Sequence, residues 1–196
     1  MALLLGKYQV KQFILENPFR VLQLPTNATT QQIRKHQQRL RIEMLDEAWK
    51  GPQKVWMPLQ TPPTEEQVSK AFAALEDPIE RFIAELFWFW PDAQGTSQFG
   101  IQAWKQSLPE QDGAAGIHNL ALFHQISALE CEDKLLAGDP AQAVHADEFW
   151  RGSWAGWEHL TAGSDVAHIF WDRLKARVRE IDDPRLTVHL VLELKR

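Results

Sequence analysis

The sequence predicts an all-α protein built from two helical modules, at about residues 16–92 and 97–196. Three observations favour this fold class. Helix-start signals recur along the chain, apolar residues between them repeat every three to four positions, and proline-rich loops separate the segments. The length of 196 residues suits one large domain or two small ones.

The first module carries three helix-start signals. In a capping box, a hydroxyl before the helix and an amide three residues later each satisfy a free backbone N–H group. In an Asp-Pro start, the aspartate accepts from the first amides, and proline lacks the N–H that would be unpaired there. The signals are Thr29 with Gln32, Thr64 with Gln67, and Asp77 with Pro78.

The helix predicted after the Asp-Pro start ends in five consecutive large apolar residues, at 86–90. We expect this helix to continue through residue 90 with apolar side chains on every face. A helix that is apolar all round is normally buried on several sides, so residues 79–90 are predicted to join the two modules. A partner-binding patch is the alternative. The residues of the predicted joint are Asp77, Pro78, Phe82, Leu86, Phe87, Trp88 and Trp90.

The second module is expected to be helical throughout. One segment, residues 116–144, resembles a helix–turn–helix of the tetratricopeptide kind, although no second copy follows at the repeat period. The last predicted helix has an apolar pattern that a strand could also show. The helices are predicted at about 97–107, 114–137, 140–161, 165–181 and 184–195.

Composition narrows the possible functions. A net charge of −5 disfavours nucleic acid as the main partner, since phosphate binders need a positive surface. Nine tryptophans indicate extensive aromatic packing or an interface. The single cysteine excludes an intramolecular disulfide and fits a reducing compartment. No apolar run reaches the roughly 18 residues of a membrane span, so we expect a cytoplasmic protein.

The residues that could carry chemistry favour a non-catalytic protein with no metal and no cofactor. His168 with Asp172, and His145 with Glu148, could share helix faces, but neither pair has a third ligand at a recognisable spacing. Cys131 falls on an apolar helical stripe and is expected to be buried and inert. No glycine-rich phosphate loop is present.

Two separated blocks occur in a characteristic order. NPFRVLQL at 17–24 precedes a basic segment, and AFAALEDPIERFIAEL follows at 71–86. Over about residues 16–90 this order resembles the J-domain of the Hsp40 co-chaperone family, in a divergent bacterial form. The matching residues are Phe19, Val21, Leu22, Leu24, Ala28, Ile33, Leu40, Ala71, Leu75, Asp77, Pro78 and Arg81.

The resemblance implies a J-domain fold but not the activity of the family. A J-domain stimulates the Hsp70 ATPase through a His-Pro-Asp tripeptide after its second helix. This chain has no such tripeptide, and Leu45-Asp46-Glu47 stand in its place.

Two sets of residues are predicted to bind protein partners. Arg34, Lys35, Arg39 and Arg41 form a basic cluster, interpreted either as an ordinary solvated helix or as a docking face for an acidic partner. Trp150, Trp154 and Trp157 share one helix face, which favours either core packing or a partner groove.

The leading hypothesis is a protein–protein interaction module, a degenerate J-like co-chaperone or adaptor that does not stimulate the Hsp70 ATPase. The partners would be an Hsp70-like chaperone or subunits of a larger assembly. The alternative is a structural scaffold subunit of a multi-protein complex.

Overall fold

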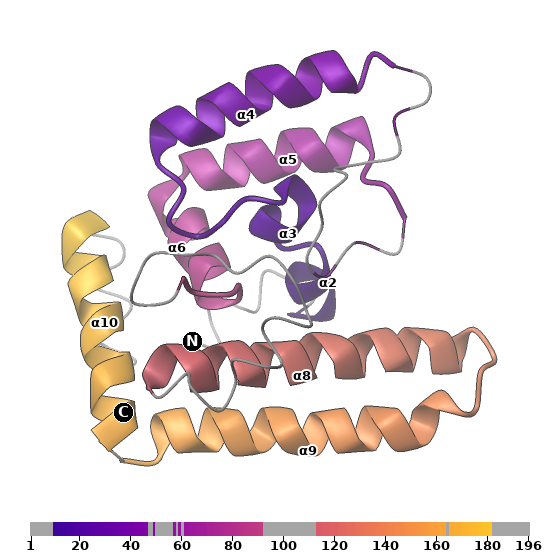
Figure 1. Ribbon diagram of the computed structural model, residues 1–196, viewed down its shortest axis with the longest axis vertical. Coiled ribbons are helices and arrows are strands. Elements are labelled where there is room, and N and C mark those ends of the chain that lie inside the picture. Colours follow the sequence, from indigo (N-terminus) through magenta and orange to yellow (C-terminus); the bar gives the residue numbers. More distant parts are fainter. Residues whose placement is uncertain are drawn as a thin grey trace. The chain divides into compact units, whose positions relative to one another are not determined.

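The computed structural model describes residues 10–46, 61–91, 113–163 and 165–181, together with Trp49, Met57 and Leu59. Every element in this part of the chain is an α-helix, and none of these residues forms a strand, which confirms the all-α prediction (Figure 1). The chain divides into two compact units, residues 16–105 and residues 1–15 with 106–196. The predicted module boundaries at 92 and 97 lie outside the described residues and remain predictions.

The first unit contains four described helices. Helix α4 lies beside α5, and α3 packs on α5 (Figure 1). Both predicted capping boxes are present, and the Asp77 carboxylate caps α6 by accepting from the Ile79 and Glu80 amides at 2.8 and 3.1 Å. The helices are α3 (Pro18–Leu22), α4 (Thr30–Glu43), α5 (Glu65–Glu76) and α6 (Pro78–Leu86).

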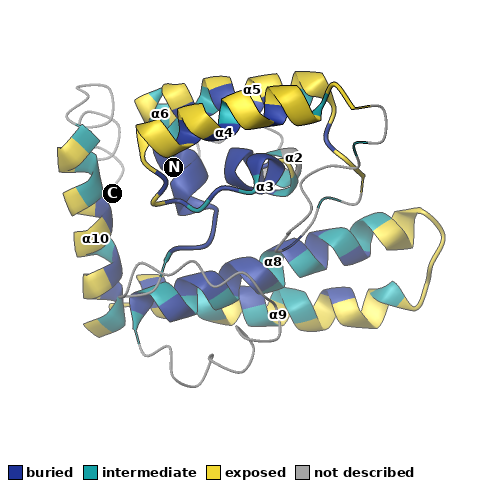
Figure 2. Cartoon of the chain, turned by 45° about the horizontal axis from the view of Figure 1, so that its top comes forward, coloured by how far each residue is buried: buried dark blue, intermediate teal, exposed yellow. Residues whose placement is uncertain are grey.

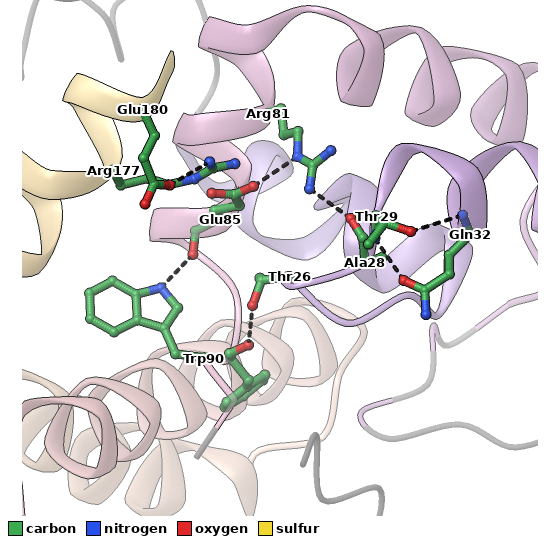
Figure 3. Close-up of polar contacts among 10 residues, drawn as sticks. Thr26, Ala28, Thr29, Gln32, Arg81, Glu85, Trp90, Arg177 and Glu180 are labelled. Atoms are coloured by element: carbon green, nitrogen blue, oxygen red, sulfur yellow. Dashed lines mark hydrogen bonds and ion pairs between the residues drawn. The ribbon is translucent and has the colours of Figure 1, made fainter. Parts of the chain in front are cut away.

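The prediction of a helix that continues through Trp90 is wrong. Helix α6 ends at Leu86, and Phe87 leaves the helical conformation with φ −104° and ψ 27°. The indole N–H of Trp90 donates to the Glu85 carbonyl at 2.8 Å (Figure 3). In a longer helix the amide of residue 89 would have used that carbonyl. The apolar run is buried as a bent segment that closes the helix end.

Asn17 fixes the end of α6 from a distant part of the chain. Its Nδ2 donates to the carbonyls of Ala84 and Phe87 at 2.9 and 3.2 Å, across 67 and 70 residues. Its Oδ1 accepts from the Phe19 amide at 3.0 Å and caps the start of α3. Since the side chain is 0% exposed and uses both donors and its acceptor, one amide ties a helix start to a helix end.

Two more polar contacts hold the segment between α3 and α4 (Figure 3). The Thr26 hydroxyl donates to the Phe89 carbonyl at 3.1 Å. Arg81 pairs through Nε with Glu85 Oε1 at 2.8 Å and donates from Nη2 to the Ala28 carbonyl, also at 2.8 Å. The segment before α4 is therefore anchored to α6 and to Phe89, which follows α6.

The second unit contains the helices predicted at 114–137, 140–161 and 165–181. They are α8 (Ala114–Leu136), α9 (Gln142–Thr161) and α10 (Asp165–Ile181), and α8 and α9 form a long hairpin (Figure 1). The helices predicted at 97–107 and 184–195 lie outside the described residues. A tetratricopeptide arrangement remains a prediction.

A short N-terminal helix, α2 (Val10–Leu15), belongs to the second unit and packs on α8. Its Ile14 is buried, and Lys11 Nζ lies 2.6 Å from Asp133 Oδ1. The sequence analysis did not place this segment.

Small residues allow α9 to approach α8 closely. A Cβ added to Gly156 would lie 2.7 Å from Ala121 Cβ, and one added to Gly152 would overlap the His124 ring. Side chains at these two positions would push the helices apart, which explains the spacing of four residues between the glycines.

Within the described residues, no helix is both long enough and apolar enough to cross a membrane.

Replacing Asn17 with Asp should destabilise the first unit. The change keeps the acceptor for Phe19 but removes the donor to two buried carbonyls, each of which costs about 1–3 kcal/mol when unsatisfied. We expect urea denaturation to show a loss of at least about 2 kcal/mol in the free energy of unfolding. Gln38→Glu, the same change of an amide to a carboxylate at an exposed residue, is the control and should stay within about 0.5 kcal/mol of the unaltered protein. Equal losses in both variants would contradict this role for Asn17.

Replacing Gly156 with Ala should destabilise the hairpin of α8 and α9 by about 1–3 kcal/mol, because the new methyl group overlaps Ala121. The same substitution in an Ala121→Gly background should cost at least about 1 kcal/mol less, since the overlapping Cβ is gone. Thermal or urea unfolding of the four proteins measures this double-mutant cycle. Additive effects would show that the contact does not limit the helix spacing.

Candidate functional site

Helix α4 buries few side chains for its length. Of its 14 residues, only Ile33, His36 and Leu40 are buried, at spacings of three and four. The rest of its surface is exposed or half-buried (Figure 2). A helix held by so narrow a stripe offers most of its circumference to solvent or to a partner.

Three of the four residues in the predicted basic cluster are exposed cations without a recorded ion pair among the described residues, namely Arg34, Lys35 and Arg41. Arg39 differs from them. Its Nη2 lies 2.7 Å from His36 Nδ1, and its Nε lies 3.4 Å from Glu43 Oε1. Within the described part of the chain, the cluster therefore consists of three exposed cations without a recorded ion pair and one cation engaged on its own helix.

The sequence analysis missed two apolar residues on the same surface. Ile42 is 71% exposed, and Leu45, in the turn after the helix, is 84% exposed. Leu45 continues the series of positions 34, 38 and 41, which lie on one side of a helix. This spacing could have been found in the sequence. We call Arg34, Lys35, Arg41, Ile42 and Leu45 the α4 outer face.

His36 anchors the inner side of α4. Its Nε2 lies 2.7 Å from the Leu22 carbonyl, and its Nδ1 faces the Arg39 guanidinium, which can only donate. The ring is therefore neutral, with its proton on Nε2 directed at Leu22. Burial lowers the pKa of His36 below its ordinary value of 6.5, and the charge of Arg39 lowers it further, against the opposing effect of the Leu22 carbonyl.

The three tryptophans predicted to share one helix face differ in their surroundings. The indole N–H of Trp150 donates to Glu132 Oε1 at 2.7 Å, and that of Trp157 donates to Gln125 Oε1 at 3.1 Å, so both turn towards α8. Trp154 is 70% exposed. Of the three tryptophans predicted to share a face, two are thus hydrogen-bonded to α8 and the third is exposed to solvent.

The residues of the predicted joint are placed as follows. Asp77 is half-buried at the start of α6, and Pro78 is exposed. The other members, Phe82, Leu86, Phe87, Trp88 and Trp90, are all buried. Their role in joining the two units remains a prediction.

The described residues contain no cluster of three or more His, Cys, Asp or Glu side chains that could hold a metal ion. Cys131 is buried, as expected, and burial raises the pKa of its thiol, so the sulfur is protonated and a weak nucleophile at neutral pH. The arrangement on α4 suits binding by charge and apolar contact.

The stability of the first unit should fall as the pH drops through the range just below 6.5. Because the folded state lowers the pKa of His36, the unfolded chain binds the proton more tightly, and unfolding is favoured below the unfolded pKa. The free energy of unfolding that depends on a neutral His36 is fully present above pH 6.5. Below that pH it declines by at most about 1.4 kcal/mol per pH unit for one proton.

Urea unfolding between pH 7.5 and 5 measures this effect. His36→Gln should remove the His36 part of the pH dependence, whereas His168→Gln, at an exposed histidine of α10, should retain it. Identical pH profiles for the unaltered protein and His36→Gln would contradict the prediction.

Comparisons with known proteins do not add a family to this geometry. No protein-family model matches the chain, and neither a curated protein nor a solved structure matches it.

Proposed function

We propose that this chain is a non-catalytic protein–protein interaction module, a degenerate J-like co-chaperone or adaptor that binds a partner through the α4 outer face. One observation carries the proposal. Three exposed cations without recorded ion pairs among the described residues lie beside two exposed apolar side chains on a helix that is otherwise lightly buried.

The chemistry of this face selects an acidic partner with an apolar patch. Arg34, Lys35 and Arg41 attract an acidic surface and speed its approach, although the chain as a whole carries a net charge of −5. Ile42 and Leu45 supply apolar area that is worth about 25 cal/mol per Å² when a partner covers it. Charge would set the choice of partner, and the apolar end would slow its release.

The order of helices supports the comparison with J-domains. Short α3 is followed by basic α4, then by α5 and the Asp77-Pro78 start of α6. The missing tripeptide argues for docking without ATPase stimulation. The hairpin of α8 and α9 would be a tetratricopeptide-like extension that presents a second surface.

A scaffold subunit of a larger assembly is the second candidate, and the exposure of Trp154 favours it. In that case the α9 hairpin would bind the other subunits and the α4 outer face would be dispensable. Charge reversal on α4 would then leave the assembly intact.

Binding to a purified Hsp70 tests the proposal, with titration calorimetry at two salt concentrations and an ATPase assay on the same samples. We expect binding that weakens with salt, without ATPase stimulation. Arg34→Glu/Lys35→Glu/Arg41→Glu should weaken it at least about ten-fold, by the loss of three attractive charges. The control, Lys70→Glu/Lys175→Glu/Arg179→Glu, reverses the same number of exposed cations elsewhere and should bind as the unaltered protein does.

Two results would overturn the co-chaperone proposal. One is the absence of Hsp70 binding at concentrations in the high micromolar range. The other is equal weakening by both triple variants, which would reduce the effect to overall charge.

A further inference from the structure

Helix α9 has an outer face opposite the side that packs on α8. The buried residues of the helix, Ala146, Ser153 and Leu160, recur every seven positions on the inner side. On the opposite side, exposed residues recur at intervals of three and four. We call these residues the α9 outer face: Val144, Asp147, Arg151, Trp154 and Glu158.

Trp154 is the largest side chain of this face. It is 70% exposed, whereas its neighbours Trp150 and Trp157 donate their indole N–H groups to side chains of α8. A tryptophan buries about 150–250 Å² when it is covered, and it is among the residues that most often dominate binding energy at interfaces. The position of Trp154 therefore indicates a contact surface.

Charges of both signs lie on the N-terminal side of Trp154, where Arg151 is accompanied by Asp147 and Glu148, and Glu158 lies on the C-terminal side. Arg151 comes three residues before Trp154 and Glu158 four residues after it, about 4.5 and 6 Å along the helix axis. Arg151 pairs with Asp147 on the same helix. Glu158 has no ion pair recorded among the described residues.

Within this pattern, Arg151 and Glu158 are complementary to each other when two copies of the helix run antiparallel, whereas Asp147 and Glu148 have no basic residue opposite them. A two-fold axis near Trp154 places Arg151 of each helix opposite Glu158 of the other and brings the two tryptophans together at the centre. A parallel pair would instead place Arg151 on Arg151 and Glu158 on Glu158, which repels. The sign and spacing of the charges thus favour one orientation.

We propose that the α9 outer face binds a second copy of this chain, with the two α9 helices antiparallel, Trp154 against Trp154 and two reciprocal pairs between Arg151 and Glu158. This surface is distinct from the α4 outer face, and the inference does not rest on the function proposed above.

The extent of the face sets the expected strength. Helix α9 has 20 residues and is about 30 Å long, so one pair of helices buries less than the roughly 1,600 Å² of a standard interface. We therefore expect a weak, reversible dimer with a dissociation constant of about 10–100 µM, at the low end of specific association.

Sedimentation equilibrium of the full chain between about 5 and 500 µM, a range set by the affinity expected for so small an interface, tests the proposal. The weight-average mass should rise from the 22.6 kDa of one chain towards twice that value. Trp154→Ala, Arg151→Glu and Glu158→Arg should each weaken association at least about ten-fold, since each removes or reverses a central contact. Lys175→Glu, which reverses an exposed cation paired on its own helix, is the control and should associate like the unaltered protein.

Mixing the two charge variants distinguishes this interface from misfolding. Arg151→Glu places Glu opposite Glu in its own dimer, and Glu158→Arg places Arg opposite Arg. A mixture of both restores two opposite-charge pairs, so we expect the mixed dimer to regain an affinity within about three-fold of the original. Circular dichroism confirms that each variant keeps its helical content.

The proposal is overturned if the unaltered chain stays monomeric up to 500 µM, a concentration well above the dissociation constant expected of such an interface. It is also overturned if it dimerises but the charge variants associate equally well, or if their mixture does not recover.

Discussion

The buried amide of Asn17 is the contact on which the first unit depends. Its Oδ1 caps the start of α3. Its two N–H groups donate to the carbonyls of Ala84 and Phe87 at the end of α6. The helices that it connects, α3 and α6, have only 5 and 9 residues, and most of these residues are buried. Their unpaired backbone groups form a large share of what must be satisfied on burial.

The same use of side chains to satisfy backbone groups recurs around α4. His36 hydrogen-bonds to the Leu22 carbonyl at the end of α3, and Arg81 donates to the Ala28 carbonyl before α4 begins. These contacts fix the helix through its inner side and its N-terminus. They explain how α4 holds its place with only three buried side chains and leaves a basic and apolar surface exposed.

Signals that act over three or four residues predicted much of the fold. The capping boxes at Thr29 and Thr64, and the ranges of α8, α9 and α10, depend on neighbours in sequence and were correctly predicted. The end of α6 was not, because Asn17, which takes its last carbonyls, lies 67 residues or more away.

The candidate sites show the same limit. Helical spacing put Trp150, Trp154 and Trp157 on one face, but that face straddles the boundary between the hairpin and solvent. Which tryptophan is exposed depends on the acceptors Glu132 and Gln125 of α8. The exposed side of α4 was predicted as a basic cluster, and its apolar part was missed although the spacing of Leu45 from Arg34 and Arg41 is visible in the sequence.

The two exposed helix faces imply different kinds of association on electrostatic grounds. The α4 outer face carries charge of one sign, so two copies of it repel, and it suits a different, acidic protein. The α9 outer face carries both signs, and reversing the helix direction places Arg151 opposite Glu158, while Asp147 stays paired with Arg151 on its own helix. Charge of one sign disfavours pairing of two α4 outer faces, whereas charges of both signs favour pairing of two α9 outer faces. Self-association through α9 would use none of the residues of the α4 outer face, and a dimer would carry two copies of that basic face.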